Sequence, residues 1–115
     1  MKSVRLLRIE NEMTREVSDI ILTRLRDPRL GMATVTGVSV SPDLSIADVY
    51  VSVLGDESAR KGTLAALGSA SAFIRREVGG KIRLRTLPEL RFHYDPSAER
   101  GERMDKILKD LHDHP

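Results

Sequence analysis

The most constraining feature of this 115-residue sequence is a pair of alternating segments separated by a short turn. In Ala33 to Ser41 and again in Ala47 to Val53, valines alternate with polar residues, as is typical of strands with one buried face. The intervening S-P-D-L-S supplies turn-forming residues, so the two segments predict a β-hairpin. In the first segment the alternating valines shift by one position across Gly37, from Val35 to Val38 and Val40, which predicts a β-bulge there.

Helical periodicity precedes and follows this hairpin. Apolar residues recur at spacings of three and four over residues 3–26, and the pattern stops at Asp27-Pro28 because the residue before a proline disfavours helical backbone. A second helical region spans Glu57 to Val78, and a third alternating segment, Leu90 to Tyr94, follows it. A helical crossover between two strands favours their parallel pairing. We therefore expect a single two-layer α+β domain, in which a mixed three-stranded sheet carries its helices on one face.

The second helical region contains a conflict that predicts a kink. In one straight helix its aliphatic residues share an arc, but Phe73 falls about 140° from the centre of that arc. A break at Ala70, Ser71 and Ala72 would return Phe73 to the buried face. Arg75 and Arg76 would then point about 130° away from the core, toward solvent.

Basic residues are concentrated in one stretch of a chain whose formal net charge is only +2. Residues 60–91 hold eight Lys and Arg against two acids, a local net charge of +6, whereas residues 92–115 have a net charge of −2. Few aromatic residues are available for base stacking, so these cations favour contacts with a phosphate backbone. The candidate phosphate contacts are Arg75, Arg76, Lys81, Arg83 and Arg85, with Lys2, Arg5 and Arg8 as a secondary cluster. A solvated face that binds nothing is the alternative reading.

Other kinds of chemistry have little support in the sequence. There is no cysteine for a disulfide, a thiolate nucleophile or a thiolate metal site, and no phosphate-binding glycine-rich motif. His93 and Asp95 could form a hydrolytic pair, but no nucleophile is evident beside them. His112 and His114 lie on an acidic C-terminal segment that makes a poor metal cage. We expect no catalysis, no metal and no cofactor. We also expect no signal peptide or membrane span, and hence a cytoplasmic protein.

Several motifs resemble the bacterial ribosome-binding factor A family. They are D-P-R-L at 27–30, T-V-T-x-V-x-V-S-x-D-L at 34–44, A-D-V-Y-V-S-V-L-G at 47–55, A-F-I-R-R-E-V at 72–78, I-R-L-R-T-L-P-E-L-R-F-H-Y-D at 82–95 and S-x-E-x-G at 97–101. The resemblance implies a KH-like fold of the type II arrangement, with an A-x-G kink between two half-helices. This chain has alanine at position 72 in place of that glycine, so we expect a milder kink.

The resemblance also implies a function. It suggests an assembly factor that binds the free small (30S) ribosomal subunit through 16S rRNA, assists late maturation and processing of the RNA 5′ end, and matters most in the cold. We expect a monomer with a KH-like ribosome-binding domain at residues 1–97, followed by a C-terminal helix and flexible tail at 98–115. Two alternatives stay open: a protein-interaction module that binds an acidic partner, and a small hydrolase using His93 and Asp95.

Overall fold

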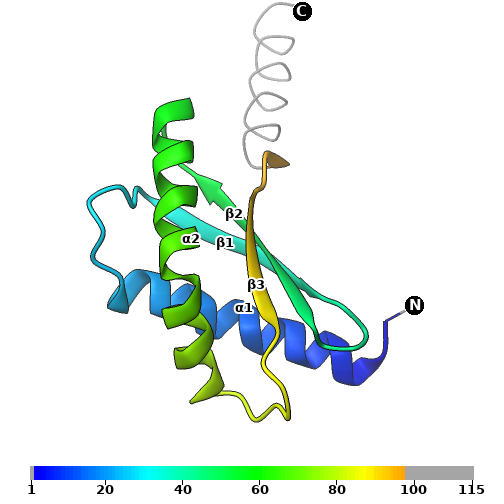
Figure 1. Ribbon diagram of the computed structural model, residues 1–115. Helices are drawn as coiled ribbons and strands as arrows, with labels where there is room; N and C mark the ends of the chain where they lie inside the picture. Colours follow the sequence, from blue (N-terminus) through cyan, green and yellow to red (C-terminus); the bar gives the residue numbers. More distant parts are fainter. Residues whose placement is uncertain (1, 98–115) are drawn as a thin grey trace, which may run out of the picture.

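The computed structural model describes residues 2–97 of the chain. Its five elements are, in order, α1 (Val4–Arg24), β1 (Ala33–Val40), β2 (Ile46–Val53), α2 (Glu57–Gly79) and β3 (Glu89–Tyr94) (Figure 1). β1 pairs antiparallel with β2, and β2 pairs parallel with β3, which gives a sheet of order β1-β2-β3. The predicted mixed sheet and element order are confirmed. The predicted tail helix lies outside the described residues.

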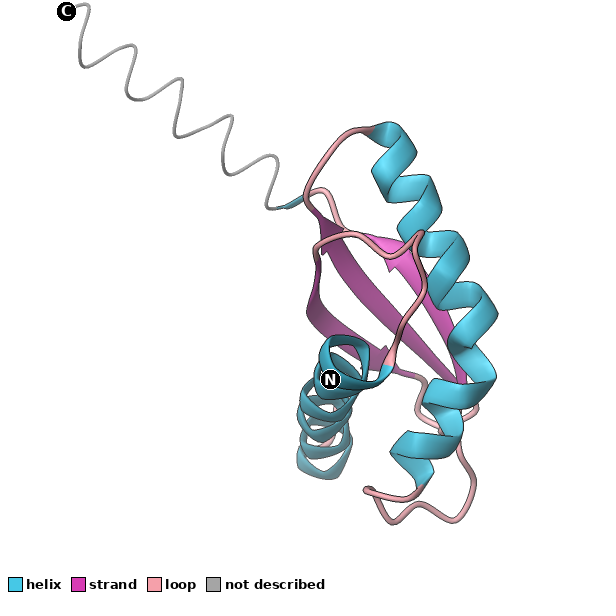
Figure 2. Cartoon of the chain, turned by 90° about the vertical axis from the view of Figure 1, so that its left-hand side faces the viewer, coloured by secondary structure: helices cyan, strands magenta, loops and turns pink. Residues whose placement is uncertain are grey.

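The two helices share one apolar core with the sheet. Figure 2 shows them crossing on the same side of the sheet. Alternate residues of β2 are buried beneath them, while Tyr50 between those residues is exposed on the opposite face. The side chains at the centre of the core have no exposed surface: Met13, Val17, Val49, Val51, Leu67 and Ile74. Each of these burials contributes roughly 1.5–3 kcal/mol, so packing of the helices on the sheet is the main source of stability.

The hairpin has the irregularity that its sequence predicts. The pairing register shifts between Val35 and Gly37, which confirms the bulge. At the β1–β2 turn, Leu44 has a positive φ of 61° and packs partly against the core. The Asp43 carboxylate accepts hydrogen bonds from the hydroxyl and the backbone N–H of Ser45, at 2.7 and 3.1 Å, and these bonds lower the pKa of Asp43. The turn is therefore held by its own polar groups.

The predicted break in the second helical region does not occur. α2 is one uninterrupted helix through Ala70, Ser71 and Ala72, although its axis bends along its length in Figure 2. Alanine and serine keep their backbone N–H groups and lack the conformational freedom of glycine, so nothing at these positions interrupts the helix. Phe73 is half-buried and packs on the edge of the core without a break.

No helix within residues 2–97 is both long enough and apolar enough to span a membrane.

Candidate nucleic-acid interface

The connector between α2 and β3, residues 80–88, displays basic side chains because apolar and basic residues alternate along residues 81–85. Ile82 is buried and Leu84 packs partly against the core, whereas Lys81, Arg83 and Arg85 point to solvent. Within residues 2–97, no hydrogen bond or ion pair engages these three cations. An alternating segment anchored on its apolar side thus holds three positive charges outward and leaves them available to a ligand.

Short contacts fix the start of this connector against the end of α2. The N–H groups of Lys81 and Ile82 both donate to the carbonyl of Val78 at 2.9 Å. Gly79 allows the chain to pack closely here, because a Cβ at that position would lie only 2.5 Å from Leu87 Cδ1. The connector therefore returns tightly along the helix, and its basic residues hold defined positions relative to α2.

Arg75 holds the end of the connector. Its Nε donates to the Pro88 carbonyl at 3.0 Å and its Nη2 donates to the Leu87 carbonyl at 2.7 Å. The predicted role of Arg75 as a phosphate contact is not tested by these bonds, but they already occupy two edges of the guanidinium. The geometry makes Arg75 a positioning residue that ties the connector to α2.

Arg76 lies on the other flank of the helix, since successive residues are about 100° apart. It is exposed, and no hydrogen bond or ion pair engages it within residues 2–97. Ser69, seven residues earlier on the same flank, accepts a hydrogen bond from Arg29 Nη2 at 3.3 Å. Arg76 therefore faces solvent on the same flank of α2 as Ser69, which binds Arg29 about two turns earlier.

Arg29 is a basic residue that the sequence analysis did not select. Its backbone N–H and its guanidinium both bind the Asp27 carboxylate, with Nη2 to Oδ2 at 2.8 Å. The side-chain hydrogen bond lowers the pKa of Asp27 and raises that of Arg29. Because the loop folds back onto α2, this ion pair lies beside Ser69, about two helical turns before Arg76. The D-P-R-L motif was the available signal, but it served only as a helix end and as a family motif, without a role for Arg29.

The secondary cluster on α1 divides into a structural member and two exposed members. Lys2 forms an ion pair with the buried Glu10 and donates to Ser39 Oγ at 2.9 Å. Glu10 Oε2 also accepts from the Val40 backbone N–H at 2.7 Å. Lys2 thus helps to attach α1 to β1. Arg5 and Arg8 are exposed and have no hydrogen-bond or ion-pair partner in the described part of the chain.

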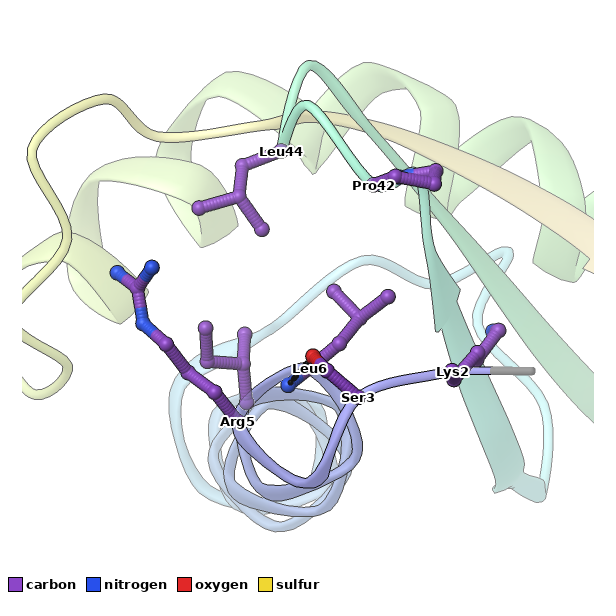
Figure 3. A pocket seen from close by; sticks show the side chains of 7 residues that line it. Lys2, Ser3, Arg5, Leu6, Pro42 and Leu44 are labelled. Carbon is purple, nitrogen blue, oxygen red and sulfur yellow. Dashed lines mark hydrogen bonds between the residues drawn. The ribbon is translucent and has the colours of Figure 1, made fainter.

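Arg5 and Lys2 border an open groove of about 490 Å³ (Figure 3). Its apolar lining comes from α1 and from the β1–β2 turn, with Leu6 and Leu44 facing each other across it. In Figure 1 the first turns of α1 and the connector lie at the lower end of the domain, away from the point where the described chain ends. The exposed cations from both segments are therefore at one end of the molecule.

The histidine and acid considered for catalysis are not paired with each other. His93 Nε2 lies 2.7 Å from Asp48 Oδ1, and its ring packs against Tyr50 with a centroid separation of 5.4 Å. Asp95 Oδ2 instead accepts from Thr36 Oγ1 at 2.6 Å. All five side chains lie on the open face of the sheet. Among the described residues, no cluster of three or more His, Cys, Asp or Glu could hold a metal ion.

Comparison with known proteins places this arrangement in a family. The family model for ribosome-binding factor A matches residues 5–108. A Ribosome-binding factor A from Staphylococcus carnosus is 45% identical over 112 residues, which is 97% of each protein. The crystal structure of ribosome-binding factor A from Thermus thermophilus superposes with a TM-score of 0.70 at 32% identity, and covers 77% of this chain and 93% of that one.

A second structural relative comes from a ribosomal complex. It is a homology model of the Thermus thermophilus factor as fitted into the cryo-EM map of a 30S–RbfA complex, with a TM-score of 0.65, 32% identity, and coverage of 77% of this chain and 93% of that one. The family match spans most of the chain, and the neighbours share its KH-like α+β fold. The chain therefore belongs to the ribosome-binding factor A family.

Proposed function

We propose that this protein binds the free small ribosomal subunit through phosphates of 16S rRNA and assists late maturation and 5′-end processing of that RNA, chiefly in the cold. Membership of the family and the relative fitted into a 30S complex support this role. The proposed role requires binding alone. A rigid basic surface that prefers one RNA arrangement shifts the RNA population toward it without breaking a bond.

The observation that carries the proposal is the set of exposed cations on the connector and the end of α2. We define this basic surface as Arg76, Lys81, Arg83 and Arg85. Within the described chain no acidic side chain neutralises them, and buried Ile82 together with the Arg75 clamp holds their backbone in place. Because the backbone that carries these cations is already anchored, less conformational entropy is lost when they bind phosphates.

The surface suits RNA backbone better than exposed bases. Phe73, Phe92 and Tyr94 all pack partly against the core, so they offer no free stacking platform. Arg60 lies over the Tyr94 ring at 4.9 Å, which further covers that ring. Backbone contacts by Arg and Lys fit structured RNA, whose deep major groove excludes side chains. Arg5 and Arg8 extend the proposed contact area along α1.

The test is sedimentation of cell extract followed by binding to purified small subunits. We expect co-migration with free small subunits and absence from translating ribosomes. Reversing the charge of Arg83 and Arg85 to glutamate should abolish co-migration. A matched double reversal of Lys61 and Arg91, which are exposed elsewhere on the domain, should leave co-migration intact.

Purified rRNA separates this proposal from a protein-interaction module. If the basic surface binds phosphates, the protein should bind protein-free 16S rRNA with a log–log salt slope of about −4 to −6, which reflects the number of phosphates contacted. Equal loss of binding in both double variants, or binding to subunits with no affinity for the naked RNA, would contradict phosphate recognition.

A further inference from the structure

The open groove between the start of α1 and the β1–β2 turn combines apolar walls with cations (Figure 3). We call it the α1–turn groove. It is lined by Lys2, Ser3, Arg5, Leu6, Ile9, Pro42 and Leu44. Its volume of about 490 Å³ lies within the range of sites that bind small molecules. Among the described residues no acidic side chain lines it, so the groove suits a ligand that has an apolar part and an anionic part.

Two leucines form opposite walls of this groove. Leu6 is buried on α1, and the half-buried Leu44 faces it from the turn (Figure 3). Leu44 has a positive φ of 61°, which is uncommon for a bulky residue, and its N–H donates to the Ser41 carbonyl at 2.8 Å. The turn therefore holds this side chain in a defined position over the groove. Apolar side chains on two sides of a slot can hold a flat nucleobase between them.

The lining carries one positive charge that is free to bind a ligand. Lys2 forms an ion pair with Glu10, so its charge is already compensated. The Asp43 carboxylate does not line the groove, and it accepts hydrogen bonds from two serine hydroxyls of its own turn at 2.8 and 2.7 Å. Arg5 is exposed and has no hydrogen-bond or ion-pair partner within residues 2–97. A phosphate at the mouth of the groove would therefore bind Arg5 without displacing an internal contact.

The position of the groove favours RNA over an acidic protein segment. The N–H of Glu89, where the connector joins β3, donates to the Ser45 carbonyl in the β1–β2 turn at 2.9 Å. The groove and the connector therefore lie at the same end of the domain, as Figure 1 also shows. An RNA whose phosphates lie on the basic surface would pass close to the groove.

We propose that the α1–turn groove binds a single unpaired nucleotide of RNA, with its base between Leu6 and Leu44 and its phosphate on Arg5. This inference rests on the proposed RNA binding and adds a contact with a base to it. Phosphate contacts position a protein on RNA but do not recognise bases. A base can enter an apolar slot only where it is unpaired and unstacked. The groove therefore gives the protein a preference for RNA that carries an unpaired nucleotide.

The first test compares two RNA probes that differ only in their bases: hexauridylate, and an abasic hexamer with the same phosphates. The parent protein should bind hexauridylate about tenfold more tightly, which corresponds to about 1.4 kcal/mol for one base. Leu44→Asn should remove this difference and leave the affinity for the abasic hexamer unchanged. Asparagine tolerates positive φ, so the turn should be retained, and a thermal melt checks that the variant is folded. Leu54→Asn is the control, because Leu54 is exposed at the opposite end of β2.

The second test concerns the phosphate. Arg5→Gln should weaken the binding of both hexamers by about fivefold, because both carry the phosphate that Arg5 binds. Arg15→Gln is the matched control, since Arg15 is exposed farther along α1 and does not line the groove. It should change neither affinity by more than about twofold, because salt screens a charge at that distance.

Nuclear Overhauser effects locate the base directly. They should connect the uracil ring protons of bound hexauridylate to the methyl groups of Leu6 and Leu44, and not to those of Leu54. Equal affinity of the parent for the two hexamers, or a folded Leu44→Asn variant that still prefers hexauridylate, would overturn the inference. It would also be overturned if a peptide of alternating leucine and glutamate shifted the same methyl resonances at a lower concentration than hexauridylate, because the groove would then be a protein-binding site.

A separate variant reports on the proposed function itself. Reversing Arg83 and Arg85 to glutamate should weaken the binding of both hexamers equally and leave the preference for hexauridylate intact. Loss of the base preference therefore tests the groove, and loss of overall affinity tests the basic surface. If the Arg83 and Arg85 reversal has no effect while Leu44→Asn acts as expected, the proposed phosphate contacts are wrong and the groove contact stands.

Discussion

Arg75 and Arg83 both lie in the basic stretch, yet the structure predicts opposite consequences of removing them. Arg75 donates two hydrogen bonds to the carbonyls of Leu87 and Pro88, at 2.7 and 3.0 Å. Arg83 is exposed on the same connector and makes no hydrogen bond or ion pair within residues 2–97. Arg75→Ala should therefore damage the domain, whereas Arg83→Ala should damage only its binding.

The size of each effect follows from these contacts. A hydrogen bond from a charged donor contributes about 1.5–3 kcal/mol when buried, and the partial exposure of Arg75 reduces the two bonds together to about 1–2 kcal/mol. In a domain of this size that loss lowers the melting temperature by about 5–10 °C. Arg83→Ala should change stability by no more than about 0.5 kcal/mol, as is usual for an exposed side chain.

Binding to purified small subunits at several salt concentrations separates the two roles. Loss of one phosphate contact in Arg83→Ala should reduce the magnitude of the log–log salt slope by about 1. Arg75→Ala should weaken binding while leaving that slope nearly unchanged, because the connector becomes mobile but loses none of its own cations. If Arg75→Ala melts like the parent protein and reduces the slope by about 1, Arg75 is a phosphate contact and the positioning role is wrong.

Two further substitutions test the packing of the helices. Glu10→Gln should lower the free energy of unfolding by about 2–3 kcal/mol, because it weakens the buried acceptor of the Val40 N–H and leaves Lys2 without its ion pair; urea unfolding measures this, with Glu12→Gln as the control. Ala72→Gly should cost about 0.5–1 kcal/mol, since glycine in an exposed helix interior adds entropy to the unfolded chain. An unchanged or higher stability of Ala72→Gly would mean that α2 is strained by alanine at this position.

Periodicity in the sequence was enough to predict the sheet, because each strand has one buried and one exposed face. The alternation in β2 places Ala47, Val49, Val51 and Val53 in the core, and the phase slip at Gly37 marks the bulge that the pairing register shows. Parallel pairing of β2 with β3 followed from the helical crossover alone. The strands and the bulge depend on alternation over a few neighbouring residues, and the pairing depends on the order of the elements; a single sequence displays both.

The prediction of a helix break was wrong because it applied the geometry of a straight helix too strictly. We had assumed that Phe73 must share the arc of Leu67 and Ile74 in order to be buried. The bend of α2 and the reach of a phenylalanine ring place Phe73 at the margin of the core, where it is half-buried. An amphipathic arc predicts which residues are central, but large side chains at its edge tolerate a wide range of angles.

Charge in the sequence located the basic stretch but could not assign a role to each cation. Lys2 and Arg75 each have an internal acceptor that Arg83 lacks. For Lys2 it is a buried carboxylate 8 positions along the chain, and for Arg75 it is two carbonyls 12 and 13 positions along the chain. A cation that satisfies an internal acceptor helps to build the surface, and a cation without one remains available to a ligand. The same distinction explains how a chain of net charge +2 presents a strongly cationic end, since some charges are satisfied internally while Lys81, Arg83 and Arg85 of the connector, Arg76 of α2, and Arg5 and Arg8 of α1 stay exposed.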